Sequence, residues 1–252
     1  MFLIYNEYME IKSADNQNVK KWEKLRQKKY RDEYGLFIVQ EKHLISEAIS
    51  KGVLEHLLVR EGCSNPFNKE AITVSDKVMK KLSSNVSLND YIAICRIEKN
   101  ELPQANSYIL LENVQDPGNV GTIIRTAYSF GYDCVILSEE CASLYNEKTI
   151  QASQGALFHI PVVTMNISEA IGKLHEMGVK IFATTLSSSH FISKTEPCEK
   201  YGLLFGNEGQ GLKEETVKLC DENIKIEMAN FESLNVAVAC GICAYYFKNN
   251  LK

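Results

Sequence analysis

The sequence of 252 residues predicts an α/β protein made of two consecutive domains. Short apolar runs that fit buried strands alternate with amphipathic helical segments along most of the chain, as in sheets covered by helices. The polar stretch 99–107, KNELPQANS, interrupts this alternation and contains a proline. We therefore expect an amino-terminal domain over 1–98, a linker over 99–107 and a second α/β domain over 108–252.

The first domain is expected to be small and to mix strands with helices. Val19, Trp22 and Leu25 give its first helix an apolar stripe, and Gly35 and Gly52 fit helix ends. Helices are predicted at 16–31, 43–50 and 76–82, and strands at 36–39, 54–59, 71–74 and 91–97. Residues 1–9 differ in character from the rest of the domain, so we expect them to be an extension, with Met9 as an alternative start.

The second domain is predicted to contain a largely parallel sheet with helical crossovers. Strands are expected at 108–111, 134–137, 160–164, 179–184, 201–205 and 224–228. A helix is predicted over 120–130, with Asn119 as its cap after a turn at Pro117-Gly118. Ser233 is expected to cap the last helix, which would bury Val236, Val238, Ala239, Ile242, Cys243 and Phe247 on one side.

Composition restricts the functional class. No apolar run approaches the roughly 18 residues of a membrane span, and Met1 to Tyr8 lacks the basic start of a secretion signal. Eight cysteines without such a signal are typical of reduced thiols, so a cytoplasmic protein is expected. The histidines form no pair at metal-ligand spacing, and Cys240-x-x-Cys243 lies in an apolar helix, which favours core packing over a metal site.

The charge distribution is uneven. The net charge is −4, but residues 12–31 hold eight lysines and arginines against Asp15 and Glu23, a local charge of +6. Such a patch on an acidic chain fits a surface that contacts phosphates. A solvated helix face fits the same pattern equally well.

Three loops at predicted strand ends combine polar residues with glycine: 112–119, 206–211 and 229–233. Ligands bind at the carboxyl ends of strands in parallel sheets, so we expect the site there. Gly206 to Gly211 reads G-x-x-G-x-G, which is not a dinucleotide fingerprint. Glu208 between glycines would repel a phosphate and suits a ligand with cationic or hydroxyl groups. Arg125, among apolar helix neighbours, either faces solvent or points into a site.

Together these stretches resemble the three motifs of the SpoU/TrmH-type RNA ribose 2′-O-methyltransferases. The motifs read DPGNVGTIIRTAYSFG from Asp116, LLFGNEGQGL from Leu203 and IEMANFESLNVAVACGICAYY from Ile226, in the family's order and spacing. The segments SADNQNVKKWEKL and HLISEA resemble the RNA-binding domain that precedes the catalytic domain in many members. The resemblance covers nearly the whole chain after Met9.

The resemblance implies a SPOUT-type catalytic domain with a trefoil knot, a homodimer and S-adenosylmethionine as cofactor. The positions that match the family's cofactor contacts are Leu186, Gly206, Asn207, Ile226, Ser233 and Leu234. Those that match its characteristic catalytic and polar positions are Arg125, Asn119, Glu208, Ser233 and Asn235. Because arginine remains protonated in proteins, we expect Arg125 to stabilise a developing alkoxide or hold a phosphate, reaching the partner's cofactor.

Several positions depart from the family pattern. Gln40-Glu41 stands where Glu-Gly is usual, Gln151 replaces a frequent arginine, Glu227 replaces a proline, and Asn230 stands where glycine is common. None of these changes touches the matched polar residues. The sequence therefore predicts an RNA 2′-O-methyltransferase acting on ribosomal or transfer RNA. The alternatives are a non-catalytic RNA-binding or ribosome-assembly protein of the same fold, and a base methyltransferase.

Overall fold

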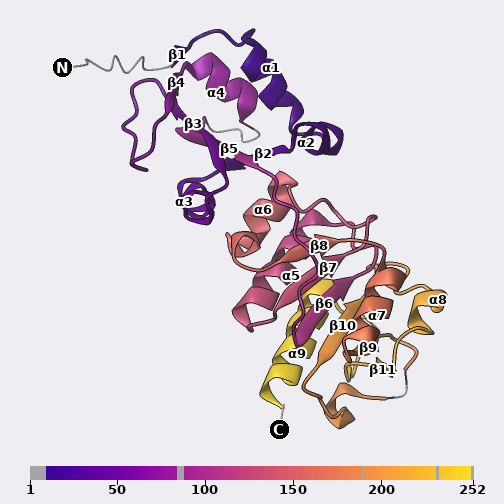
Figure 1. The fold of residues 1–252 in the computed structure, drawn as a ribbon. Helices are drawn as coiled ribbons and strands as arrows, with labels where there is room; N and C mark the ends of the chain where they lie inside the picture. Colours follow the sequence, from indigo (N-terminus) through magenta and orange to yellow (C-terminus); the bar gives the residue numbers. More distant parts are fainter. Residues whose placement is uncertain (1–9, 84–87, 189, 231–232, 251–252) are drawn as a thin grey trace. The chain divides into compact units, whose positions relative to one another are not determined.

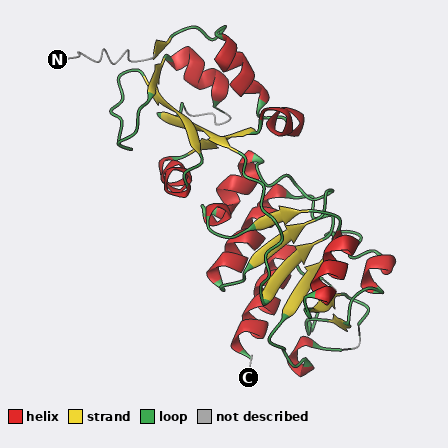
Figure 2. Ribbon diagram, in the orientation of Figure 1, coloured by secondary structure: helices red, strands yellow, loops and turns green. Residues whose placement is uncertain are grey.

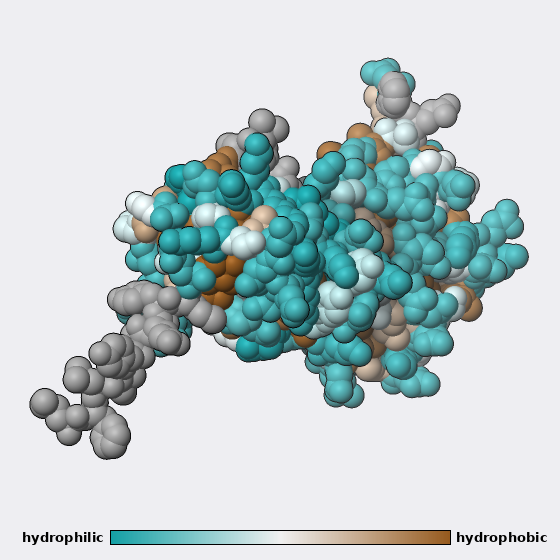
Figure 3. Space-filling view, turned by 90° about the horizontal axis from the view of Figure 1, so that it is seen from above, coloured by the Kyte–Doolittle hydropathy of each residue, from teal (hydrophilic) through white to brown (hydrophobic). Residues whose placement is uncertain are grey.

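The structure, a computed structural model, describes residues 10–83, 88–188, 190–230 and 233–250. The chain divides into two compact units, Met1–Glu98 and Lys99–Lys252, and each has its own sheet (Figures 1 and 2). The predictions for residues 1–9 lie outside the described residues. On the face shown in Figure 3 the surface is largely hydrophilic, with hydrophobic residues in small separate patches.

The amino-terminal unit has a five-stranded mixed sheet in the order β1-β4-β3-β5-β2. Its strands are β1 (Glu10–Ile11), β2 (Leu36–Gln40), β3 (Leu54–Arg60), β4 (Ile72–Val74) and β5 (Tyr91–Arg96). β4 pairs in parallel with β1 and β3, whereas β5 is antiparallel to β3 and β2. β1, with two residues, carries too little pattern to be predicted.

The helices of this unit are α1 (Gln17–Lys24), α2 (Lys28–Tyr34), α3 (Lys42–Lys51) and α4 (Asp76–Leu82). The single helix predicted over 16–31 is therefore wrong, because the chain breaks after α1. Arg31 explains the break: its side chain is buried, and its Nη1 donates to the carbonyls of Leu25 and Arg26, both at 2.9 Å. The buried guanidinium thus binds carbonyls that the end of α1 leaves free.

Helices cover both faces of this sheet. Val19 and Trp22 of α1 join Val78 and Met79 of α4 in one apolar cluster with strand residues such as Leu58. The buried side chains of α3 lie outside this cluster, and Figure 1 shows α3 on the opposite side of the sheet. Two-sided burial makes this unit a small α/β domain with its own core.

The carboxyl-terminal unit has a six-stranded, wholly parallel sheet in the order β11-β9-β10-β6-β7-β8. The strands are β6 (Ser107–Leu111), β7 (Cys134–Leu137), β8 (Val162–Thr164), β9 (Lys180–Thr184), β10 (Tyr201–Phe205) and β11 (Glu222–Ile224). The helices are α5 (Pro117–Ser129), α6 (Glu147–Ser153), α7 (Ile167–Glu176), α8 (Glu214–Val217) and α9 (Val236–Asn249), with 3-10 turns at Ala156–Phe158 and Ile192–Lys194.

This sheet is also covered on both faces, as Figure 2 shows. Apolar residues of α7 share a cluster with Tyr108, Leu110 and Ile136 of the sheet. On the other face α5 packs against α9 and α6. A Cβ on Gly121 would lie 2.4 Å from the Thr149 carbonyl oxygen, so the close approach of α5 to α6 requires glycine there.

Several predicted boundaries of this unit are corrected by the structure. Asp116, not Asn119, caps α5, and its carboxylate accepts from the Asn119 amide at 2.8 Å with Pro117 as first helical residue. Asn235, not Ser233, caps α9. Within α9, Val238 and Ile242 are 51% and 39% exposed, so they do not belong to the buried side. Cys240, Ala244 and Ala237 complete that side instead.

The strand predicted over 224–228 ends at Ile224. Beyond it, Lys225 bonds to segment 190–192 instead of the sheet: its amide donates to the His190 carbonyl at 2.9 Å, and its carbonyl accepts from Ile192 at 2.8 Å. Segment 190–195 is thus bonded both to the chain leaving β11 and to α9, where the Tyr246 hydroxyl donates to the Thr195 carbonyl. The family resemblance implies that the chain is threaded into a trefoil knot in this region.

Candidate active site

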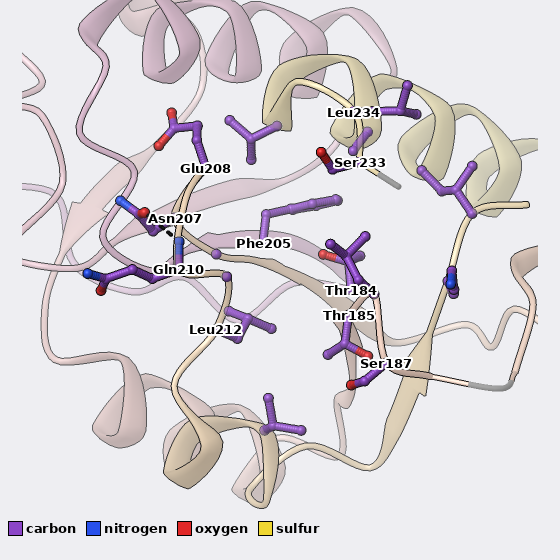
Figure 4. A pocket seen from close by; sticks show the side chains of 18 of the residues that line it. Thr184, Thr185, Ser187, Phe205, Asn207, Glu208, Gln210, Leu212, Ser233 and Leu234 are labelled. Atoms are coloured by element: carbon purple, nitrogen blue, oxygen red, sulfur yellow. Dashed lines mark hydrogen bonds between the residues drawn. The ribbon is translucent and has the colours of Figure 1, made fainter. Parts of the chain in front are cut away.

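A cavity of about 530 Å³ opens where three neighbouring parallel strands end. β9, β10 and β11 are adjacent, so the loops that follow them meet at one edge of the sheet. The volume lies in the range of small-molecule sites. Figure 4 shows side chains from all three loops around this space, with Phe205 on its floor and Ser233 and Leu234 above it.

All six residues matched to cofactor contacts line this cavity: Leu186, Gly206, Asn207, Ile226, Ser233 and Leu234. Leu186 follows β9, Gly206 and Asn207 follow β10, and Ile226 follows β11. Ser233 and Leu234 precede α9. A position on the wall is a necessary condition for binding, and their individual roles remain predictions.

Asn207 organises the glycine loop from within. Its backbone exchanges two hydrogen bonds with Gly211, of 3.0 and 2.9 Å. Its Oδ1 accepts from the amides of Gly209 and Gln210, and its Nδ2 donates to the Asn113 carbonyl at 2.8 Å. All these bonds fix the loop before any ligand arrives, so Asn207 supports the wall mainly as a structural residue.

The glycines of this loop are not equivalent. A Cβ on Gly206 would lie 2.4 Å from the Gly211 carbonyl carbon, so no larger residue fits while the loop is closed. Gly211 has a φ of +71°, a left-handed conformation that favours glycine. A Cβ on Gly209 would be 3.5 Å from its nearest neighbour, an ordinary contact. The first and last glycines therefore shape the loop, and the middle one does not.

Three of the matched polar residues form one hydrogen-bonded chain at the cavity mouth. Asn119 Nδ2 donates to Glu208 Oε1 at 2.8 Å, and Asn235 Nδ2 donates to Asn119 Oδ1 at 3.0 Å. Asn235 Oδ1 accepts from the amides of Ala237 and Val238 at the start of α9. The residues come from α5, the loop after β10 and the cap of α9, and β6 next to β10 brings the first two loops together.

The order of donors in this chain is determined by its fixed end. Because Asn235 Oδ1 must face the helix amides, its Nδ2 faces Asn119, which must then present its oxygen. Asn119 Nδ2 is thereby directed at the Glu208 carboxyl group. Figure 4 shows the Glu208 carboxylate pointing away from Phe205, in keeping with its bond to Asn119.

The other two matched residues are placed differently. Ser233 is exposed and lines the cavity. Arg125 is exposed on α5, does not line the cavity of its own chain, and forms no hydrogen bond or ion pair with the described residues. The structure therefore brings Asn119, Glu208 and Asn235 together and leaves Arg125 apart from them.

Comparisons with known proteins agree with this geometry. The model of the SpoU rRNA methylase family matches residues 106–245, and that of an MRM3-like substrate binding domain matches residues 16–93. The 23S rRNA (guanosine(2553)-2′-O)-methyltransferase RlmP of Bacillus subtilis is 34% identical over 95% of this chain and 99% of its own. The chain belongs to the SpoU rRNA methylase family.

Solved structures extend the likeness to the cofactor. The AdoMet-bound rRNA methyltransferase of Sinorhizobium meliloti is 28% identical, with a TM-score of 0.85 over 96% of this chain and 98% of that chain. AviRb of Streptomyces viridochromogenes, in complex with AdoMet, has a TM-score of 0.85 at 22% identity over 93% of this chain and 97% of its own, and supports the fold alone. The SpoU-family chain is an RNA 2′-O-ribose methyltransferase with S-adenosylmethionine as cofactor, as the three motifs predicted.

The cavity fits this cofactor. Its wall combines apolar side chains, among them Phe205, Leu212 and Ile226, with the main chain of two loops, which suits a nucleoside held by backbone groups. The absence of a Cβ at Gly206 lets that main chain approach closely. When bound, S-adenosylmethionine supplies a methyl group already activated by a sulfonium.

The sequence did not single out several residues of this wall. Thr184 ends β9, and Thr185 and Ser187 follow it. Lys218 and Lys225 add two cations directly after α8 and β11. The β9 residues were within reach of sequence reasoning, because β9 and β10 are parallel neighbours and their loops share an edge. The lysines carried no local signal, since they lie among other charged surface residues.

The remaining reactive groups have structural explanations. Cys240 and Cys243 are fully buried in α9, and burial raises the pKa of both thiols, that of Cys243 to about 12. Their predicted role in core packing agrees with this burial. Among the described residues, no group of three His, Cys, Asp or Glu side chains is placed to hold a metal ion. No helix in the described ranges is long and apolar enough to cross a membrane.

Proposed function

We propose that this enzyme methylates a ribose 2′-hydroxyl of 23S ribosomal RNA as a homodimer in which Arg125 of each subunit completes the partner's site. The observation that carries the proposal is an incomplete site. The cavity of one chain adjoins Asn119, Glu208 and Asn235, whereas Arg125 lies outside it. Arg125 is also the only arginine in residues 99–252.

An exposed apolar stripe along α9, which packs against α5, supports the second subunit. Leu234, Val238, Ile242 and Tyr245 recur at helical spacing on one face and are 39% to 59% exposed. Tyr245 contacts Phe130, which caps α5, edge to face with ring centroids 5.9 Å apart. Such a continuous exposed stripe on a helix at the site's rim is typical of a subunit interface. A second copy of the chain would cover it and carry its own Arg125 to this cavity.

In the proposed reaction the ribose O2′ forms a bond to the methyl carbon while the carbon–sulfur bond breaks, leaving a thioether. The hydroxyl proton leaves for solvent or for a carboxylate. The guanidinium of Arg125 stays protonated and stabilises the developing negative charge on O2′. Glu208, held by Asn119, accepts a hydrogen bond from the nucleotide or orders the loop. Alignment by these groups supplies most of what the step needs.

The amino-terminal unit is proposed to hold the RNA. The matched family model is a substrate binding domain, and the relative in Bacillus subtilis acts on guanosine 2553 of 23S rRNA. A 23S rRNA fragment that contains this nucleoside is therefore the first substrate to test. A ribosomal RNA substrate also implies a cytoplasmic reaction.

Subunit mixing tests the shared site. We expect Arg125→Ala to bind S-adenosylmethionine normally but lose methyl transfer by on the order of 10²- to 10³-fold. Gly206→Val should lose cofactor binding because its side chain collides with Gly211. When the two inactive variants are refolded or co-expressed together, mixed dimers contain one intact site, which restores about a quarter of wild-type activity. Failure to restore activity in verified mixed dimers would place Arg125 in its own subunit's site.

The oligomeric state and the product are checked separately. Val238→Glu should convert dimers into monomers in light scattering, whereas Leu219→Glu, also exposed but outside the stripe, should not. Digestion and mass spectrometry of methylated 23S rRNA should yield a 2′-O-methyl nucleoside that resists alkaline cleavage. A base-methylated product would refute the ribose assignment. Cofactor binding without methylation of any RNA would favour the non-catalytic alternative.

A further inference from the structure

We propose that Tyr30 and Tyr34 of α2, flanked by lysines of α1, form a stacking surface for unpaired nucleotides of the RNA substrate. This inference rests on the proposed function for the identity of the ligand as RNA. It assigns the contact to a defined face of the amino-terminal unit, which we call the tyrosine-lysine surface and define as Lys21, Lys24, Lys29, Tyr30 and Tyr34.

The two rings form an ordered pair. Their centroids are 5.8 Å apart with an interplanar angle of 28°, a stacked arrangement one helical turn apart. Both side chains are half-buried, and Tyr34 packs against the apolar cluster of α1 and α4. Neither hydroxyl forms a hydrogen bond within the described residues. Tyr34 thus anchors the pair on the core, and both rings keep exposed area that a flat ligand can contact.

Three lysines lie over these rings. Lys21 Nζ is 5.0 Å from the centroid of Tyr34, and Lys24 and Lys29 Nζ are 5.1 and 5.7 Å from that of Tyr30. Three such contacts within residues 21–34 concentrate cations around one aromatic pair. Each ammonium can move to a phosphate when a base takes its place on the ring, because lysine side chains are long and flexible.

The charges around this surface leave it cationic. Lys21, Lys24 and Lys29 form no ion pair with described residues. The acids Asp32 and Glu33 lie on α2, as Lys29 does. The nearby acids are partly engaged elsewhere: Asp15 pairs with Lys20 at 3.3 Å, and Glu23 with Lys81 at 3.2 Å. Three cations that no carboxylate neutralises directly fit a phosphate backbone.

The break between α1 and α2 creates this surface. In one continuous helix, residues 21 and 34 would be more than three turns apart, roughly 20 Å at 1.5 Å per residue. The buried guanidinium of Arg31, bonded to the carbonyls of Leu25 and Arg26, holds the turn that brings α2 back beside α1. A buried arginine thus sets the geometry of an exposed binding surface.

Unpaired nucleotides fit this surface better than a duplex. Exposed bases stack on aromatic side chains, whereas the bases of a helix are stacked on one another and present only backbone and groove edges. Two adjacent rings with cations on their rims offer room for about two bases and their phosphates. The target of the enzyme is therefore expected to carry single-stranded nucleotides near the modified ribose.

The test uses the full-length protein and fluorescence anisotropy with a fluorescein-labelled oligouridine of about 12 nucleotides. Tyr30→Ala should weaken binding at least about fivefold, and Tyr30→Phe, which keeps the ring, should bind like the wild type. Lys21→Ala with Lys24→Ala should lower the slope of log K against log salt by about 1.4, at 0.7 per lost phosphate contact. Lys69→Ala with Lys77→Ala removes the same charge elsewhere on this unit and should leave the slope unchanged.

The outcomes separate this inference from the proposed function. Wild-type methylation of 23S rRNA together with unchanged oligonucleotide binding by Tyr30→Ala would overturn the tyrosine-lysine surface alone. Equal effects of Tyr30→Ala and Tyr30→Phe, or tighter binding of a duplex than of oligouridine, would also overturn it. Absence of methyl transfer from the wild type to any RNA would instead refute the proposed function. Fluorescence of Trp22, the only tryptophan, checks that each variant is folded.

Discussion

The two units of the chain carry opposite charge. Residues 1–98 contain 16 lysines and arginines against 14 acids, a net charge of +2, whereas residues 99–252 contain 12 against 18, a net charge of −6. RNA is a polyanion, so the acidic unit with the cofactor cavity is expected to repel it, whereas the amino-terminal unit with its net positive charge attracts it. Within the acidic unit the single arginine stands where the reaction is proposed to need a cation.

The units also differ in how they use polar groups. The carboxyl-terminal unit holds Glu208 through two asparagines, so the site is preorganised by hydrogen bonds of 2.8 and 3.0 Å. The amino-terminal unit presents lysines on flexible stems above aromatic rings. Chemistry on one ribose needs fixed geometry, whereas holding a variable RNA surface needs adaptable cations. Changes in each unit should therefore affect different steps.

The largest effect is expected from Gly206→Ala. The new Cβ would lie 2.4 Å from the Gly211 carbonyl carbon, so the loop cannot keep its closed form. We expect cofactor affinity in calorimetry to fall by at least about 100-fold, with RNA binding unchanged. Gly209→Ala, which meets only an ordinary contact, should bind the cofactor normally. Loss of RNA binding in Gly206→Ala would contradict the separation of roles between the units.

A smaller effect is expected from Asn119→Asp. The change replaces the donor to Glu208 with a second carboxylate, which repels Glu208, while the other carboxylate oxygen can still accept from Asn235. We expect kcat to fall on the order of 10- to 100-fold, with little change in KM for RNA. Gln115→Glu adds the same charge to the same loop without removing a bond to Glu208 and serves as control. An equal fall of kcat in both variants would show that the added charge, and not the lost bond to Glu208, causes the effect.

A stabilising change is expected in the amino-terminal unit. Glu41 has a φ of +74° and a ψ of 129°, a conformation that favours glycine and strains other residues. Glu41→Gly should therefore raise the free energy of unfolding by about 1 kcal/mol. Trp22 is the only tryptophan of the chain and lies buried in this unit. Denaturation followed by tryptophan fluorescence therefore reports selectively on the amino-terminal unit. Glu47→Gly, in the middle of α3, should instead lower stability by about 1 kcal/mol.

The smallest effect is expected from Lys180→Met in the carboxyl-terminal unit. Lys180 pairs with Glu222 between β9 and β11, and this bond raises the lysine pKa. Both side chains are about one-third exposed, so the loss should stay below about 1 kcal/mol in thermal unfolding. A change in cofactor affinity would show that this surface pair supports the cavity as well as the strands.

The sequence predicted the limits of helices and strands correctly where local residue signals mark both ends of the element. β7, β10 and α4 have the predicted limits, because each is an apolar or amphipathic run flanked by glycine, proline or a capping residue. The matched polar residues were found from motif resemblance. Their contacts were not, because the bond between Asn119 and Glu208 joins residues 89 positions apart and depends on β6 lying next to β10.

Errors arose where tertiary structure overrides the local pattern. The helix over 16–31 breaks because a buried Arg31 binds carbonyls at the break, which no periodicity reveals. β11 ends early because segment 190–192 competes for Lys225. Val238 and Ile242 were predicted to be buried because hydropathy does not distinguish a buried apolar helix face from an exposed one. No rule based on local sequence patterns predicts a knot, which the family resemblance alone implies.

The order of the site residues along the chain has a consequence for synthesis. Ile226 and Leu234 of the cavity wall, and Asn235 of the polar chain, all lie between β11 and α9, late in the sequence. A chain that ends at β11 therefore lacks these wall residues and lacks the Asn235 amide that orients Asn119 toward Glu208. A chain cut at this point would therefore be expected neither to bind the cofactor tightly nor to transfer a methyl group.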